Sequence, residues 1–251
     1  MSERFLELFF EAHHGLPRQG PGSRESTRRA LAMVPDLPEC PRILDLGCGP
    51  GRQSLDLAEL TGGTVTAVDI HEPFLDQLRA EAQVRGLAGR VAILNRDMAQ
   101  TGLPPACFDL LWSEGALYTI GLGNALCAIR PLLRPGGCLA FTELAWLSDE
   151  RPQEAARFWA EGYPEMLDIP GNLALLESAG YEPLGHFILP AEDWWREYYA
   201  PLEANLPAFE RKHAGEAEAM QVAALERAEM DLHRGFHETY GYVFHVARRK
   251  G

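Results

Sequence analysis

An alternation of short apolar runs with helical patterns, between residues 41 and 144, constrains the fold more than any other feature of the chain. Each run has the length and the β-branched or aromatic content of a strand, and the segments between the runs repeat apolar residues every three or four positions, as helices do. The runs are RILDLG at 42–47, TVTAVDI at 64–70, RVAILN at 90–95, FDLLWS at 108–113 and GCLAFTEL at 137–144. Strands that alternate with helices predict βαβ units and an α/β fold with a doubly wound, mostly parallel sheet.

Helical patterns fill three of the intervals between these runs. They are QSLDLAEL at 53–60, FLDQLRAEAQVRG at 74–86 and NALCAIRPLL at 124–133. Gly86 closes the second pattern and Arg134-Pro135-Gly136-Gly137 follows the third. Glycine and proline in such positions are typical helix terminators, which supports the predicted boundaries.

The rhythm changes after residue 145, where aromatic and helical segments replace the short repeats. Strand-like runs remain at 182–190 and 240–249, separated by a long acidic helical region. Two late strands complete an α/β sheet, and no Gly/Ser/Pro-rich hinge divides the chain. We therefore expect one domain over 1–251, made of N-terminal helices or a lid at 1–35, a cofactor-binding core at 36–145, and a helical substrate cover with the last two strands at 146–251.

Charge and composition narrow the classes of partner. With 36 acidic against 23 basic residues the formal net charge is −13, which opposes binding to a phosphate backbone. No apolar stretch approaches the roughly 20 residues that span a bilayer, and the charged start MSERFLELFF is unlike a signal peptide. Five cysteines without a CxxC pair disfavour a disulfide framework or a zinc site. We expect a cytoplasmic protein with no metal, nucleic-acid or membrane partner, and a homodimer remains open.

A glycine-rich segment, Asp45-Leu46-Gly47-Cys48-Gly49-Pro50-Gly51, joins the first strand to the first helix. Glycines there allow a sharp turn and the close approach of a ligand, and the following helix offers free N–H groups. The spacing G-x-G-x-G differs from the G-x-G-x-x-G of dinucleotide binders. Asp45 would oppose a diphosphate and favour a ligand that carries a cation, which argues against a nicotinamide cofactor.

Polar residues also follow the next strands. Asp69 ends the second strand, near the spacing of about 20 residues expected for a carboxylate that binds ribose hydroxyls. After the third strand, Asp97 can accept a hydrogen bond from an adenine amino group and Met98 can pack on the ring. Because the carboxyl ends of parallel strands meet at one edge of the sheet, these residues predict a nucleoside site there.

Taken in order, DLGCGPG, AVDI, RDM, FDLLWSEGALYTIG and LRPGGCLAFTE resemble class I S-adenosylmethionine-dependent methyltransferases. The resemblance covers roughly residues 41–145 and favours the small-molecule branch related to the ubiquinone/menaquinone-biosynthesis enzymes. It implies a seven-stranded Rossmann-like sheet whose last strand runs antiparallel between its neighbours. It also implies S-adenosyl-L-methionine as the methyl donor and S-adenosyl-L-homocysteine as the product.

The same resemblance assigns the cofactor contacts. Gly47, Cys48 and Gly49 would line the methionine part of the cofactor with Asp45 nearby, and Ser113 would face the same part. Asp69 would hold the ribose, while Asp97 and Met98 would contact adenine. The full set of predicted cofactor contacts is Gln19, Asp45, Gly47, Cys48, Gly49, Asp69, Ile70, Asp97, Met98 and Ser113. Each assignment has a plain structural alternative. The glycine-rich segment would be only a strand–helix turn and Asp45 a helix cap. Cys48 would be a small residue that fits the turn, and Met98 would belong to the core.

Candidate catalytic groups follow the fourth and fifth strands. Methyl transfer is an in-line displacement in which the enzyme mainly positions the acceptor, and a base is needed only if the nucleophile carries a proton. Glu114 is the first candidate for that base, Glu143 the second, and Tyr118 an orienting hydroxyl. Alternatively, either glutamate caps a helix or binds a cation of the substrate.

The apolar N-terminal helix pattern FLELFFEAHHG and the flexible segment RQGPGS after it predict a lid over the ligand, and a surface helix docked on the sheet is the alternative. The predicted function is transfer of a methyl group to a small molecule. A non-catalytic S-adenosylmethionine-binding or regulatory protein is the alternative. A nucleic-acid methyltransferase is disfavoured because Ser113-Glu114-Gly115-Ala116 replaces Asn/Asp-Pro-Pro-Tyr, and a protein arginine methyltransferase because Gly123 stands where a second glutamate is needed.

Overall fold

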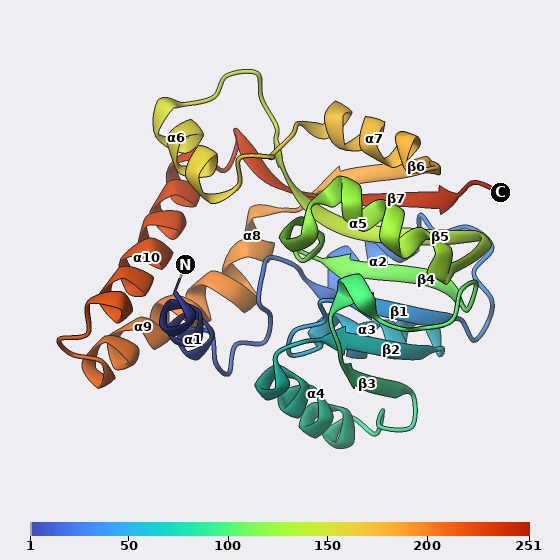
Figure 1. Ribbon diagram of the computed structural model, residues 1–251, viewed down its shortest axis with the longest axis horizontal. Helices are drawn as coiled ribbons and strands as arrows, with labels where there is room; N and C mark the ends of the chain where they lie inside the picture. The colour runs from blue at the N-terminus through green and yellow to red at the C-terminus, as the bar shows by residue number, and fades with distance from the viewer. Residues whose placement is uncertain (1) are drawn as a thin grey trace.

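The computed structural model describes residues 2–251, and within that range the strands form one seven-stranded sheet in the order β3-β2-β1-β4-β5-β7-β6 (Figure 1). The strands are β1 (Arg42–Leu46), β2 (Thr64–Asp69), β3 (Val91–Asn95), β4 (Phe108–Glu114), β5 (Leu133–Trp146), β6 (Tyr181–Ile188) and β7 (Tyr240–Arg249). Strands β1 to β5 are parallel, and β7 runs antiparallel to both β5 and β6. The predicted doubly wound sheet with an antiparallel last strand is confirmed. Met1, the first residue of the predicted 1–35 segment, lies outside the described residues.

Helices cover both faces of the sheet. One face packs on α2 (Arg24–Leu31), α3 (Arg52–Thr61) and α4 (Glu72–Val84), and the other on α5 (Leu122–Ile129) and α7 (Ile169–Ser178). The central strands β1, β4 and β5 are mostly buried, because βαβ connections place helices on each face of a parallel sheet.

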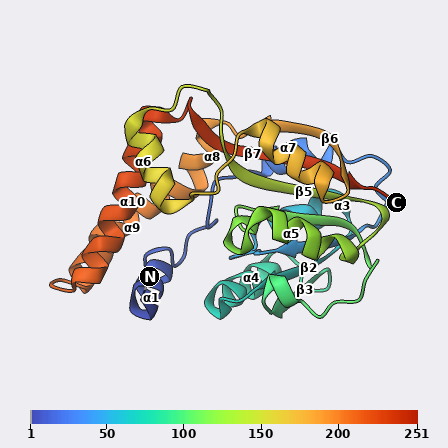
Figure 2. The same ribbon diagram turned by 45° about the horizontal axis from the view of Figure 1, so that its top comes forward.

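A third group of helices, which we call the helical cover, lies beyond the carboxyl ends of the parallel strands (Figure 1). It consists of α1 (Glu3–Ala12), α6 (Gln153–Gly162), α8 (Ala191–Trp194), a π-helical turn at Trp195–Tyr199, α9 (Ala200–Lys212) and α10 (Ala217–Phe236). Their apolar faces share one core, which is rich in aromatic residues. In the turned view, α9 and α10 extend away from the sheet with α1 beside them (Figure 2). The ligand edge of the sheet therefore faces a wall built from both ends of the chain.

The region around Pro131 differs from the sequence-based prediction. The helical pattern predicts a helix over 124–133 and a strand over 137–144, but α5 ends at Ile129 and β5 already begins at Leu133. A short 3-10 turn, Arg130–Leu132, connects them. Proline has no N–H to donate and its ring clashes with the carbonyl four residues earlier, so the α-helix stops before it.

Strand β5 also extends farther than its parallel neighbour. The last β4–β5 pair is Glu114 with Thr142, whereas the pairing of β5 with β7 continues from Glu143 to Trp146. This two-stranded extension carries Glu143 beyond the edge of β4 and toward the helical cover. Within residues 2–251, no helix is long and apolar enough to cross a membrane.

Candidate active site

The glycine loop between β1 and α3 is held by backbone hydrogen bonds and close packing. The amides of Gly47 and Cys48 both donate to the Val68 carbonyl, at 2.9 and 3.0 Å. Gly51 has a φ of 78°, and a Cβ there would overlap the side chain of Leu78 on α4. Glycine is required at this position by backbone conformation and by the approach of α4, so the loop is rigidly placed at the sheet edge.

The Asp69 carboxylate is tied to that loop. Its Oδ2 accepts from the Gly49 amide at 2.8 Å and its Oδ1 accepts from the His71 amide at 2.9 Å. A carboxylate offers about four acceptor positions, so each oxygen keeps capacity for a ligand hydroxyl. The neighbouring Ile70 side chain is 65% exposed, an apolar surface beside the carboxylate. This arrangement suits a ribose with a flat ring next to it.

Asp97 and Met98 stand at the end of β3 beside the same loop. The Asp97 Oδ1 accepts from the Ala99 amide at 2.8 Å and so caps the short 3-10 turn Met98–Gln100. The Met98 Cε lies 3.2 Å from the place where a Cβ on Gly47 would stand. The thioether therefore reaches across to the glycine loop, where a ligand ring would lie.

Asp45 is a buried carboxyl group with one oxygen unused. Ser54 donates to Oδ2, and Oδ1 has no hydrogen-bond partner within residues 2–251. Burial raises the pKa of Asp45 to about 7, with the hydrogen bond from Ser54 opposing the shift. Because a buried carboxylate without a partner is costly, a ligand that donates hydrogen bonds or brings positive charge would be stabilised here. This observation fits a cationic cofactor at the glycine loop.

Two of the predicted cofactor contacts, Ser113 and Cys48, have polar groups that are hydrogen-bonded within the protein or buried. The Ser113 hydroxyl donates to the Leu46 carbonyl at 2.8 Å and joins β4 to β1 inside the sheet. Burial raises the pKa of the Cys48 thiol well above its ordinary value, so it stays protonated and unreactive. Cys48 therefore fits the interpretation of a small residue in a tight loop.

The N-terminal segment lies over the cofactor end of the sheet. Gln19 donates to the His13 carbonyl at 3.1 Å, and its Cγ lies 3.2 Å from where a Cβ on Gly49 would stand. On α1, the Phe10 ring stacks on His71, with ring centroids 4.2 Å apart. The segment thus touches the glycine loop and the β2–α4 connection while α1 packs with the helical cover.

Arg18 is an anchor that the sequence patterns did not reveal. Its side chain is 3% exposed, and its Nε and Nη1 donate to Glu197 at 2.9 Å and to Glu114 at 2.8 Å. Its Nη2 lies 3.4 Å from Asp56 Oδ2. One guanidinium thereby links the N-terminal segment to β4, α3 and the π-helical turn of the cover. The short motif RQGPGS carries no signal for these partners, which come from distant parts of the chain.

The two candidate bases point to opposite faces of the sheet. Glu114 pairs with Thr142, so Glu143 is one position farther along and its side chain alternates to the other face. Glu114 faces α2, where Arg18 binds one oxygen and the Trp112 indole donates to the other at 2.8 Å. Both oxygens of Glu114 are thus engaged within the protein, which leaves Glu143 as the free carboxyl.

Glu143 is buried, and apart from the nearby Tyr163 hydroxyl no side chain within residues 2–251 donates to it. Burial raises its pKa to about 8, and the Tyr163 hydroxyl nearby opposes the shift. The ring of Tyr163 lies 5.5 Å from that of Tyr118, the predicted orienting hydroxyl. The structure therefore brings Glu143 and Tyr118 together and adds Tyr163, which directly follows α6 and stands in none of the motifs.

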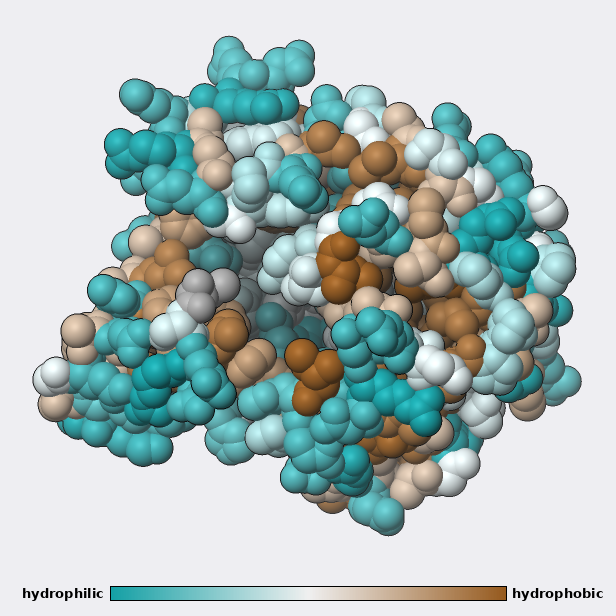
Figure 3. All heavy atoms as spheres, viewed as in Figure 1, coloured by the Kyte–Doolittle hydropathy of each residue, from teal (hydrophilic) through white to brown (hydrophobic). Residues whose placement is uncertain are grey.

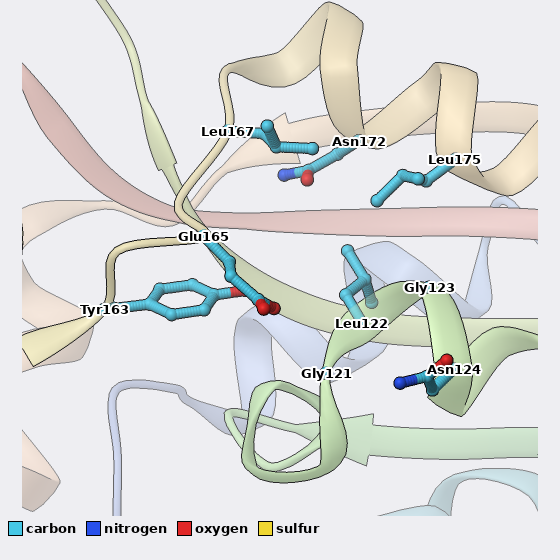
Figure 4. Close-up of a pocket in the computed structure, with 9 residues that line it drawn as sticks. All are labelled: Gly121, Leu122, Gly123, Asn124, Tyr163, Glu165, Leu167, Asn172 and Leu175. Atoms are coloured by element: carbon cyan, nitrogen blue, oxygen red, sulfur yellow. The ribbon is translucent and has the colours of Figure 1, made fainter.

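A pocket of about 440 Å³ opens beside these tyrosines, between the start of α5 and the segment that joins α6 to α7 (Figure 4). In the close-up, the Tyr163 hydroxyl and the Glu165 carboxylate lie together next to Gly121. The pocket is lined by Gly121, Leu122, Gly123, Asn124, Tyr163, Glu165, Leu167, Asn172 and Leu175. Its size is within the usual range for small-molecule sites, roughly 300–1,000 Å³.

The space-filling view shows the same edge from outside. The surface is hollowed between the helical cover and the ends of the strands (Figure 3). Open α/β sheets bind ligands in this position, at the carboxyl ends of the strands. In the part of the chain that the structure describes, no group of three or more His, Cys, Asp or Glu side chains is arranged to hold a metal ion. The polar groups available to a ligand are thus carboxyls, hydroxyls and backbone amides.

The chain matches a known protein family over its central part. Residues 43–137 match the family described as "Methyltransferase domain". This range begins in β1 and ends in β5, and it contains the glycine loop, Asp69, Asp97 and Glu114.

Two curated relatives illustrate how far the likeness extends. The 27-O-demethylrifamycin SV methyltransferase of Amycolatopsis mediterranei is 28% identical over 232 residues, which cover 89% of this chain and 82% of that protein. A sterol 24-C-methyltransferase of Gibberella zeae is 28% identical over 176 residues, which cover 66% of this chain and 46% of that protein. The chain therefore spans about half the length of the sterol enzyme.

Among solved structures, a SAM-dependent methyltransferase of Thiobacillus denitrificans in complex with S-adenosyl-L-homocysteine matches with a TM-score of 0.82. The two proteins are 22% identical, and the alignment covers 99% of each chain. At this identity the likeness establishes the fold, including the helical cover as well as the sheet.

Proposed function

Since residues 43–137 match the methyltransferase-domain family, we propose that this protein is an S-adenosylmethionine-dependent methyltransferase that acts on a small molecule. The family predicted from the motifs is confirmed by that match. The observation that carries the activity is the glycine loop, in which the Gly49 amide binds the Asp69 carboxylate while the nearby Asp45 keeps a buried oxygen without a partner. A nucleoside diol on one side and a cationic amino-acid group on the other would satisfy both.

The cofactor contacts follow from this placement. Asp69 binds the ribose hydroxyls, Ile70 and Met98 enclose the adenine, and the exposed Asp97 accepts from the adenine amino group. Asp45 balances the positive end of the ligand, and Gln19 covers the glycine loop. Ser113 supports the site through its bond to Leu46 rather than through a free hydroxyl.

S-adenosyl-L-methionine supplies a methyl group already activated on a sulfonium, and S-adenosyl-L-homocysteine remains as the product. The protein's part is to position the acceptor, to exclude water and to take up any proton that the acceptor carries. We assign the proton to Glu143, because Glu114 is engaged by Arg18 and Trp112 and because the pKa of Glu143, about 8, lets its carboxylate form accept a proton increasingly as pH rises toward 8. Tyr118 orients the acceptor, and Glu114 positions the N-terminal segment through Arg18.

We propose that α1 and the segment up to residue 23 form the lid over this site. Its support is the contact of Gln19 with the glycine loop and of Phe10 with His71. The net charge of −13 supports a small-molecule acceptor rather than a nucleic acid. We further propose a cytoplasmic location, because all five cysteines are free thiols, and leave a homodimer as a possible assembly.

Titration calorimetry tests the proposal. The protein is expected to bind S-adenosyl-L-methionine and S-adenosyl-L-homocysteine and not NAD. Asp69→Ala is expected to weaken the binding by about 1–3 kcal/mol, roughly 5- to 150-fold, because buried hydrogen-bond partners are lost. Asp76→Ala, an exposed change on α4, serves as the matched control with unchanged affinity.

Absence of binding by both nucleosides would overturn the proposal. Binding without formation of S-adenosyl-L-homocysteine in a broad screen of acceptors would instead favour a non-catalytic S-adenosylmethionine-binding protein.

A further inference from the structure

The pocket in Figure 4 lies at the N-terminal end of a helix whose first amides are free. Helix α5 begins at Leu122, and Gly121 before it has no side chain that could cap the helix. The first amide of α5 with a partner is that of Ala125, which donates to the Gly121 carbonyl at 2.9 Å. Within residues 2–251, the amides of Leu122, Gly123 and Asn124 have no hydrogen-bond partner. All three residues line the pocket, so it holds donors that a ligand can use.

A buried side chain on α7 adds an independent donor to the same pocket. Asn172 is 1% exposed, and its Nδ2 has no hydrogen-bond partner in the described part of the chain. In the close-up, its amide group projects from α7 into the space between Leu167 and Leu122 (Figure 4). A buried N–H group without a partner is costly, and a ligand oxygen that accepts from it recovers that free energy. Together with the α5 amides, Asn172 marks a place for an oxygen atom between two helices.

A carboxylate at the rim decides between an anionic and an uncharged oxygen. Glu165 is exposed, and its Oε2 lies 3.7 Å from where a Cβ on Gly121 would stand, at the same end of α5. A negative charge in that position already balances the positive end of the helix dipole. It forms no side-chain cap on α5, so the amide donors stay available. An anionic ligand would be repelled by Glu165, whereas an uncharged carbonyl oxygen can accept from these donors.

The remaining walls suit an apolar body and adjoin the candidate active site. Leu122, Leu167 and Leu175 line the pocket, whose volume is about 440 Å³. Tyr163 lines it as well, and its ring centroid lies 5.5 Å from that of Tyr118, which follows β4. A molecule in this pocket therefore has its polar oxygen held at α5 and α7 while another part reaches the tyrosines at the ends of the strands.

We propose that this pocket holds the methyl acceptor, and that the acceptor is an uncharged molecule with an apolar body and a carbonyl oxygen. The carbonyl oxygen accepts from Asn172 Nδ2 and from the free amides of the first turn of α5, and the apolar body packs on the leucines. This inference rests on the proposed methyltransferase function, because it identifies the substrate class of the same site.

Three probes that share a phenol ring test the inference by calorimetry. The full-length protein, saturated with S-adenosyl-L-homocysteine, is titrated with 4-hydroxyacetophenone, with 4-ethylphenol, which lacks the carbonyl oxygen, and with the anion 4-hydroxybenzoate. The ketone is expected to bind at least about fivefold more tightly than either, since one net hydrogen bond contributes roughly 2- to 12-fold in affinity. Apolar contact alone would instead favour 4-ethylphenol. Equal or reversed affinities, or no binding by the ketone, overturn the inference.

Replacement of the buried amide locates the effect. Asn172→Leu is expected to reduce the preference for the ketone over 4-ethylphenol by at least about threefold, because it removes one donor and keeps an apolar side chain of similar size. Gln83→Leu, which also replaces an amide by leucine but at an exposed position of α4, should retain the preference. An unchanged preference in a folded Asn172→Leu variant contradicts the assignment. Circular dichroism and S-adenosyl-L-homocysteine affinity establish that each variant is folded.

An exposed change tests the selection against anions even if the buried variant does not fold. Glu165→Gln is expected to strengthen the binding of 4-hydroxybenzoate by about threefold and to leave that of the ketone within about twofold. Glu177→Gln, an exposed change on α7, should alter neither. An unchanged affinity for 4-hydroxybenzoate in Glu165→Gln contradicts the role of the rim. If the parent protein binds no S-adenosyl-L-homocysteine, the proposed function fails; if it binds but shows no ketone preference, only the substrate class fails.

Discussion

The glycine loop and the Glu143 carboxyl lie at the same edge of the sheet and are built in contrasting ways. In the loop, backbone amides bind the Val68 carbonyl and the Asp69 carboxylate, so most of the geometry is fixed before any ligand arrives. Glu143 is buried, and apart from the nearby Tyr163 hydroxyl no side chain within residues 2–251 donates to it. The contrast agrees with the proposed function, in which a preformed cofactor seat lies beside a carboxyl group that is left for the acceptor.

The Arg18 anchor ties the N-terminal segment to β4, to α3 and to the helical cover, and breaking it is expected to have the largest effect. Arg18→Met leaves Glu114 and Asp56 buried without their cation, so the free energy of unfolding should fall by about 3–5 kcal/mol. Urea unfolding measures the change. Arg28→Met removes only an exposed pair with Glu25 and should stay within about 0.5 kcal/mol. A small loss for Arg18→Met, equal to that of the control, would show that the anchor is dispensable.

Rigidity of the glycine loop is tested at Gly51. Gly51→Ala forces a Cβ into a left-handed backbone and into the Leu78 side chain, which together should cost about 3 kcal/mol and lower cofactor affinity. Gly86→Ala has a similar φ of 67° with nothing within 4 Å of the added Cβ, so it should cost about 1 kcal/mol. Thermal unfolding compares the two variants. Equal losses would mean that backbone strain alone, and not the approach of α4, requires glycine at this position.

Glu143 should reveal itself in the pH dependence of stability. Burial holds the pKa of Glu143 at about 8 in the folded protein, above its ordinary value of 4.5, so the folded state keeps a proton that the unfolded state releases. Stability is therefore lost as pH rises from about 4.5 to 8. Glu143→Gln removes this loss, and relative to the parent it should gain on the order of 2 kcal/mol between pH 4 and pH 6.

Urea unfolding at several pH values measures that gain. The other titratable groups are present in both proteins, so their contributions largely cancel when the stability of the parent is subtracted from that of the variant at each pH. Glu177→Gln, which changes an exposed carboxylate, should give a difference from the parent that is flat with pH. A flat difference for Glu143→Gln as well would show that Glu143 is already solvated or paired.

The smallest expected effect is a difference in thiol reactivity between buried and exposed cysteines. Cys40 and Cys127 are exposed, whereas Cys48 in the glycine loop and Cys138 in β5 are buried. Burial also raises the pKa of the Cys48 thiol, so iodoacetamide should label the exposed pair first under native conditions. Peptide mass spectrometry follows the labelling. Rapid labelling of Cys48 would mean that the loop opens and is less rigid than its hydrogen bonds indicate.

The glycine loop could be predicted from the sequence better than the surroundings of Glu143, for a physical reason. The strands, the glycine spacing and Asp69 are local or periodic features, and the parallel order brings them to one edge. The predicted boundary between helix and strand near Pro131 was wrong, because the apolar spacing of a helix continues in the sequence past this proline, where the α-helix itself cannot continue. The family and the sheet could therefore be predicted from residues 41–145.

The surroundings of Glu143 depend on contacts that no local pattern encodes. The β5–β7 extension carries Glu143 toward the helical cover, and Arg18 finds partners on three separate elements. The sequence analysis placed Glu114 first and Glu143 second as candidate bases. The alternation of side chains in the β4–β5 register turns them to opposite faces, so that Glu114 supports the N-terminal segment and Glu143 lies near Tyr163.

A crystal structure of the protein with S-adenosyl-L-homocysteine tests the cofactor seat most directly. The ligand is expected in the hollow at the carboxyl ends of β1 to β4, with both ribose hydroxyls within hydrogen-bond distance of Asp69 and the amino group on the side of Asp45. A ligand bound elsewhere, or a ribose without contact to Asp69 in a fully occupied site, would contradict this assignment.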